Sequence, residues 1–104
     1  MRFSSVCTLI LAATSAPTAF SWIITTYSST TCDASTAFLP PIDQSGTGCW
    51  VVHAGSNSLK LGGDISGRSF SVYSDFGCQN FVGNLLAQTD VCENGSTIGS
   101  VKVQ

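Results

Sequence analysis

The sequence predicts an all-β protein, a single-domain β-sandwich built from two similar halves. Two observations lead to this fold class: an internal repeat, and short runs of β-branched and aromatic residues separated by turns that contain Gly or Pro. Short strands with this punctuation are typical of β-sandwiches. No long segment has apolar residues at helical spacing, which supports the same prediction.

The repeat is carried by the frame Tyr-Ser-x-x-x-Cys. It occurs at residues 27–32 and returns 46 residues later at residues 73–78. A second cysteine follows each copy, Cys49 or Cys92, and then a matching tetrad, Ser-Leu-Lys-Leu at 58–61 or Ser-Val-Lys-Val at 100–103. Four matched features in the same order favour duplication over coincidence.

The expected strands follow from β-branched, aromatic and alternating residues, and the breaks between them from Gly, Pro and polar clusters. Proline residues 40 and 41 stop the second strand, and residues 43–48 read as a flexible loop. Residues 54–57 and 90–95 read as a turn and a loop, and residues 80–86 as a mixed segment. The strands are expected at 21–27, 36–39, 49–53, 58–61, 69–73 and 96–103.

The N-terminus has the layout of a secretory signal peptide over residues 1–21. One positive charge precedes an apolar run, and small residues follow, so cleavage is expected after Ala19 or Ser21. The run is too short to span a bilayer. We therefore expect a secreted, extracellular domain over residues 22–104, divided into motif one at 22–63 and motif two at 64–104.

Four cysteines remain after signal removal: Cys32, Cys49, Cys78 and Cys92. An even number in an oxidising compartment predicts two disulfides, which a domain of this size needs because its core is small. The sequence allows three connectivities. A zinc site is not expected, since the chain has no Cys-x-x-Cys pair and a single histidine.

Charge excludes several classes of partner. The mature chain carries three cations and six anions, a net charge of −3. It has no basic patch for nucleic acid and is not a cationic peptide that attacks membranes. We expect a monomer with no cofactor, whose partner is an extracellular or host protein or a glycan.

The repeated frame, an aromatic residue followed by a Ser-apolar-basic-apolar strand, resembles the Greek-key motif of βγ-crystallins. The resemblance implies a double Greek-key sandwich in which the tetrad serine supports a folded hairpin. In place of the family's second aromatic the chain has Cys32 and Cys78. In place of its glycine, where the backbone needs positive φ, it has Ala34 and Asn80.

The same resemblance implies the disulfide pairing. Each hairpin cysteine is expected near the start of its own half's last strand. The implied bonds are therefore Cys32–Cys49 and Cys78–Cys92, both within one half.

Catalytic and metal sites are not expected. Microbial βγ-crystallins often bind calcium through an acidic or Asn pair, but the aligned frames at 53–58 and 95–100 do not begin with one; Glu93 and Asn94 lie just outside the second frame. His53, the only histidine, is not accompanied by a Gly-x-Ser-x-Gly elbow, and no carboxylate pair suits a glycosidase. Asn94-Gly95-Ser96 is an N-glycosylation sequon, expected in a surface loop.

These observations favour a non-enzymatic secreted protein. Export, four cysteines, low charge and no catalytic motif also resemble the small secreted cysteine-rich proteins of filamentous fungi, which implies an effector with a role in virulence or host interaction. The alternatives are a crystallin-fold antimicrobial or killer-type toxin and a structural calcium-binding stress protein. A toxin directed at cell envelopes would be basic, and the stress protein would need intact calcium loops.

Overall fold

The protein is all-β, as the sequence predicts. The computed structural model describes residues 21–104, so the expected signal segment lies outside the described residues except for Ser21. Beyond the strands, these residues form one short 3-10 helix, η1, at Ala34–Thr36. The strands are β3 (Trp22–Tyr27), β4 (Ile42–Gln44), β5 (Gly48–Gly63), β6 (Phe70–Tyr73), β7 (Phe81–Asn84) and β8 (Glu93–Val103).

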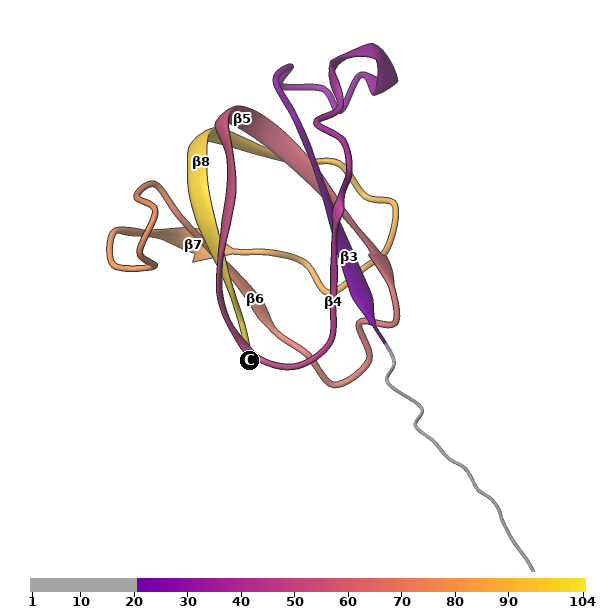
Figure 1. Ribbon diagram of the computed structural model, residues 1–104, viewed down its shortest axis with the longest axis vertical. Coiled ribbons are helices and arrows are strands. Elements are labelled where there is room, and N and C mark those ends of the chain that lie inside the picture. Colours follow the sequence, from indigo (N-terminus) through magenta and orange to yellow (C-terminus); the bar gives the residue numbers. More distant parts are fainter. Residues whose placement is uncertain (1–20) are drawn as a thin grey trace, which may run out of the picture.

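The six described strands form one antiparallel sheet in the order β4-β3-β5-β8-β6-β7 (Figure 1). The two long strands, β5 and β8, pair with each other at the centre of the sheet. On either side of this pair stand the strand that opens each half, β3 or β6, and then an edge strand, β4 or β7. From either edge inward, the sheet therefore has the same kinds of strand in the same order: an edge strand, the strand that opens that half, and a long strand.

Equivalent registers relate the two halves. In the first half Tyr27 lies opposite Ser58, and in the second Tyr73 lies opposite Ser100. The register continues in step, with Ile24 opposite Leu61 and Phe70 opposite Val103. The repeated frame and the tetrad of each half are thus paired in the same way, as duplication of one unit predicts.

Each long strand serves both halves. Residues 48–51 of β5 pair with residues 100–103 of β8, while residues 58–59 of β5 pair with residues 93–94 of β8. Two register shifts separate these stretches, between Val51 and Ser56 and between Ser56 and Ser58. Such irregularities bend a strand without ending it, because extra residues on one strand increase the local twist. The first part of each half's long strand therefore lies against the other half's tetrad.

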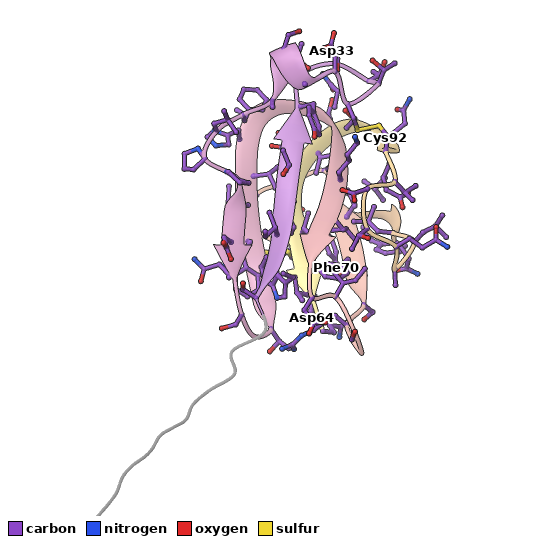
Figure 2. All side chains as sticks on the ribbon, turned by 90° about the vertical axis from the view of Figure 1, so that its right-hand side faces the viewer. Asp33, Asp64, Phe70 and Cys92 are labelled. Atoms are coloured by element: carbon purple, nitrogen blue, oxygen red, sulfur yellow. A yellow bond between two sulfur atoms is a disulfide. The ribbon has the colours of Figure 1, made fainter. Side chains whose placement is uncertain are left out.

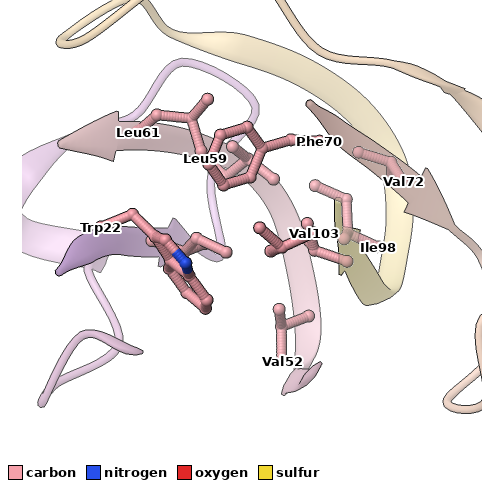
Figure 3. Packing of buried hydrophobic residues seen from close by; sticks show 10 residues of the cluster. Trp22, Val52, Leu59, Leu61, Phe70, Val72, Ile98 and Val103 are labelled. Atoms are coloured by element: carbon pink, nitrogen blue, oxygen red, sulfur yellow. The ribbon is translucent and has the colours of Figure 1, made fainter. Parts of the chain in front are cut away.

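The sheet bends strongly around its core. Trp22 on β3 and Phe70 on β6 are separated by two strands in the sheet order, yet their ring centroids are 6.1 Å apart in an edge-to-face arrangement. In a flat sheet the distance between these strands would be about 14 Å. Figure 3 shows Trp22, Phe70 and Val103 directed into one interior. Burying each large apolar side chain contributes about 1.5–3 kcal/mol.

Four local predictions are wrong: the strand at 36–39, the loop at 43–48, the turn at 54–57 and the loop at 90–95. Residues 36–39 do not form a strand; η1 ends at Thr36, and Ala37 forms a single bridge with Tyr27. The loop expected at residues 43–48 overlaps β4 instead, because the chain returns antiparallel to β3 once past Pro41. The turn expected at 54–57 lies inside β5, and β8 begins within the loop expected at 90–95.

Candidate functional site

The most regular feature of the molecule is a pair of serine-held hairpins. The first hairpin, residues 28–37, follows β3, and the second, residues 74–80, follows β6. The buried Ser58 hydroxyl accepts from the Cys32 N–H at 3.1 Å and donates to the Ser29 carbonyl at 2.7 Å. Ser58 thus provides hydrogen-bond partners for two backbone groups of the hairpin that are not paired with a neighbouring strand.

The second hairpin repeats this arrangement. The buried Ser100 hydroxyl accepts from the Cys78 N–H at 3.0 Å and donates to the Asp75 carbonyl at 2.7 Å. Gly99 lets the hairpin approach so closely, since a Cβ there would lie 2.6 Å from the Ser74 carbonyl oxygen. In the first half the corresponding residue is Asn57, which donates to the Ser28 carbonyl. The two hairpins are therefore held alike but not identically.

A side chain at the same position also closes each hairpin from within. In the first, the Ser29 hydroxyl accepts from the Asp33 N–H at 3.0 Å. In the second, the Asp75 carboxylate accepts from the N–H groups of Asn80, Gln79 and Gly77. The Asn80 N–H is the largest cause of an Asp75 pKa below its ordinary value, and desolvation opposes it.

The two hairpin cysteines adopt left-handed backbone conformations, with φ of 53° at Cys32 and 55° at Cys78. The resemblance aligns the family's glycine, whose backbone has positive φ, with Ala34 and Asn80, but neither residue has positive φ here, and Ala34 lies in η1. The tight turn therefore occurs two residues earlier, at the cysteine itself.

The implied disulfide pairing is also wrong. The bonds are Cys32–Cys92 and Cys49–Cys78, with Cα atoms 5.9 and 6.1 Å apart, and both link one half to the other. The exchange of strand parts is the physical reason. The Cys32 sulfur lies 3.5 Å from the Leu59 carbonyl oxygen. Leu59 pairs in the sheet with Glu93, which is the residue after Cys92. Figure 2 shows Cys92 at the same end of the molecule as Asp33, the neighbour of Cys32, and away from Asp64 and Phe70.

The second bond follows the same rule. Cys49 pairs in the sheet with Lys102, two residues from Ser100, and Ser100 holds Cys78. Cys49 lies in the stretch of β5 that pairs with the second half's tetrad, and Cys92 directly precedes the stretch of β8 that pairs with the first half's tetrad. The bonding partner of each is therefore the other half's hairpin cysteine, and the two bonds obey one symmetric rule.

Trp22 belongs to the interior, and Trp50 is half-buried and packed against it. Trp22 is buried, and its ring centroid lies 4.7 Å from that of Trp50, edge to face. The Trp22 indole N–H donates to the Gly46 carbonyl at 3.0 Å, so its polar atom is satisfied. Packing accounts for the position of both rings.

His53 lies on the surface of β5, stacked on Phe38 with centroids 5.0 Å apart and planes within 9°. No serine or carboxylate side chain within residues 21–104 is hydrogen-bonded to its ring. Leu39 and Val51 are 72% and 56% exposed. We call these residues the Phe38 patch: Phe38, Leu39, Val51 and His53.

A second apolar surface lies at the edge strand β7 and continues into the next loop. Phe81, Val82 and Leu86 are 57%, 49% and 58% exposed, and we call them the β7 patch. Beside it is a cavity of about 100 Å³ between β7, β6 and the first residues of β8, lined among others by Val82, Leu85 and Ile98. Ligand pockets for drug-sized molecules are several times larger.

The sequon lies at this cavity. Asn94 lines it, is exposed, and belongs to β8 opposite Ser58 rather than to the expected surface loop. Glu93 lines it as well and accepts from the Leu86 N–H at 3.1 Å. Glu93 and Asn94, which lie just outside the second frame compared with calcium loops, therefore both line this cavity beside β7.

The frames at 53–58 and 95–100 lie within β5 and β8. Among the described residues, no group of three or more His, Cys, Asp or Glu side chains is arranged to hold a metal ion. The same part of the chain contains no helix long and apolar enough to cross a membrane.

The comparisons with known proteins give no relative. Neither a family model, nor a curated protein, nor a solved structure matches the chain.

Proposed function

We propose that the chain is an exported, non-enzymatic interaction protein of the effector type. The observation that carries the proposal is the pair of disulfides that join the two halves at equivalent positions. Disulfides persist in oxidising, extracytoplasmic environments and are reduced in the cytosol. Two symmetric cross-links suit a small domain that must stay folded outside the cell.

For the fold we propose a double Greek-key sandwich of the βγ-crystallin type. Three features support it: the equivalent registers of the two halves, the tetrad serines that hold both hairpins, and the strand parts exchanged between halves. The bend that brings Trp22 to Phe70 supports two facing layers. Motif one would then cover residues 22–63 and motif two residues 64–104, with the second beginning just after β5.

The contact surface that we propose is the Phe38 patch. Its aromatic pair is already stacked, so the rings lose little freedom on binding. Leu39 and Val51 add exposed aliphatic surface. Aromatic and aliphatic side chains without a pocket suit a protein partner better than a sugar, because sugar sites also need hydrogen-bonding groups placed around a ring.

The test measures binding of the labelled, oxidised protein to the surface of candidate host cells. Leu39→Ser and Val51→Ser should reduce binding, since each removes apolar contact area. Phe76→Ser is the matched control, because Phe76 is equally exposed but lies on the second hairpin. Equal binding by all variants, or killing of microbial cells by the wild type, would contradict the proposal. Loss of binding after treatment of the cells with glycosidases would make the partner a glycan.

A further inference from the structure

The β7 patch is an unprotected sheet edge. β7 is the last strand in the sheet order, and its outer side has no strand partner among residues 21–104. Phe81 and Val82 are largely exposed on it, and the strand contains no charged residue. Exposed edges of this kind template association with other chains unless something covers or interrupts them.

The opposite edge shows the contrast. β4 occupies the corresponding end of the sheet, follows two prolines and carries the exposed carboxylate of Asp43. Proline and charge are the usual means of protecting an edge strand. The protein therefore protects one edge through its sequence and leaves the equivalent edge apolar.

The sequon lies where a cover for β7 would be attached. Asn94 is exposed and lines the same cavity as Val82 and Leu85. Leu86, the third member of the β7 patch, is tied through its N–H to Glu93, the residue before Asn94. Asn94 lies opposite Ser58 in the sheet, and Val51 lies opposite Ser100, the equivalent serine. Asn94 is therefore the second half's counterpart of Val51, whose side chain faces outward.

We propose that Asn94 carries an N-linked glycan that lies over the β7 patch and shields this edge. In the transfer, the Asn94 side-chain nitrogen forms a bond to C1 of an oligosaccharide carried on a lipid diphosphate. The amide loses one proton, and the bond from C1 to the phosphate oxygen breaks, so that the lipid diphosphate leaves. No electrons are exchanged. The proposal requires passage through a secretory route that has this donor, and it does not depend on the Phe38 patch.

A bulky, hydrated oligosaccharide on Asn94 would do two things at β7. It would block the approach of a second strand to the outer edge, and it would cover apolar surface that the sparse charges of this chain do not solubilise. The cavity of about 100 Å³ is too small to be the glycan's own binding site. The sugar therefore acts by covering the surface around the attachment point.

The test expresses the full chain in a eukaryotic secretory host. Wild type and Ser96→Thr, which keeps the sequon, should gain the mass of one oligosaccharide, and Asn94→Gln should not. Binding of a fluorescent apolar dye and the solution mass by light scattering are then compared. Asn94→Gln, and wild type treated with peptide N-glycosidase in the folded state, should bind more dye and shift from monomer to larger species.

A second substitution locates the effect. Val82→Ser added to Asn94→Gln should restore low dye binding and the monomer, whereas Val51→Ser added to Asn94→Gln should not. An unmodified Asn94 in a host that glycosylates a control sequon overturns the proposal. So does a glycosylated protein whose dye binding and solution mass do not change when the glycan is removed.

Discussion

At the scale of single residues, Ser58 and Ser100 are the links between the repeat in the sequence and the repeat in the structure. Each is fully buried, and each hydroxyl both accepts from a cysteine N–H and donates to a hairpin carbonyl. Their identity at one position of each tetrad is therefore explained by two backbone groups that no strand partner satisfies.

Replacing either serine by alanine should destabilise the protein by about 1–3 kcal/mol, because a buried N–H and a carbonyl lose their partner. Chemical denaturation of Ser58→Ala and Ser100→Ala measures this. Ser66→Ala, at an exposed position, is the control. A cost confined to one of the two serines would mean that the hairpins are not held alike.

Gly99→Ala should be strongly destabilising, since the added methyl group would meet the backbone of Ser74 and Asp75. Gly83→Ala is the matched control within the same half: it lies in β7, and a Cβ there would have nothing within 4 Å. We expect the melting temperature to fall sharply for the first variant and to stay near that of the wild type for the second. Similar values for both would contradict the close approach of the second hairpin.

We expect Asp75 to make the second hairpin sensitive to acid. Its pKa is lowered in the folded protein, so its contribution to stability is present above its unfolded pKa of about 4 and is lost as the pH falls through the lower folded value. Asp75→Asn, which keeps an accepting oxygen, should flatten the dependence of the unfolding free energy on pH below about 4. Denaturant titrations of the variant and of the wild type between pH 7 and pH 2 test this, and equal slopes for the two would contradict it.

At the scale of elements, the long strands decide the connectivity of the disulfides. Because β5 and β8 each reach the other half's tetrad, every bridge joins two halves that the sequence presents as separate units. The bridged cysteines are 60 and 29 positions apart. In the chain-entropy model each bond is worth about 4 kcal/mol. Loss of either should thus remove much of the stability of a domain this small.

A tryptic digest distinguishes the two kinds of pairing. Cleavage after Lys60 and Arg68 leaves Cys32 and Cys49 in one peptide and Cys78 and Cys92 in another. Without reduction, the observed bonds join these peptides into one species, which separates when dithiothreitol is added. Two independent peptides, each with an internal bond, would contradict the cross-half pairing. A further digest at Asp and Glu residues then separates Cys32 from Cys49 and identifies the partner of each.

At the scale of the whole molecule, calcium should leave the melting temperature unchanged. A ligand that binds only the native state raises stability by mass action. The described part of the chain gathers no set of acidic side chains that would attract the ion. Thermal unfolding with millimolar calcium, against a chelator control, tests this. A clear rise would favour the calcium-binding stress protein over the effector.

The sequence by itself determined the β class, the β3 and β6 strands and the two-fold repetition. Period-two alternation and β-branched residues act locally, and each tetrad serine follows the tyrosine of its own half, by 31 residues in the first half and by 27 in the second. Four cysteines in a short chain likewise predicted two disulfides, and both are present.

Only the tertiary structure decided which cysteines meet, where the first edge strand forms, and which surface surrounds Asn94. The partner of Cys32 depends on residues 93–94 joining β5, a pairing between segments more than 30 residues apart. Local patterns cannot specify such a partner. The first part of each long strand could pair within its own half or with the other half, and both arrangements satisfy the same alternation of apolar and polar residues. In the structure, the exchange is accompanied by two register shifts in the pairing of β5 with β8, and such shifts bend a strand without ending it.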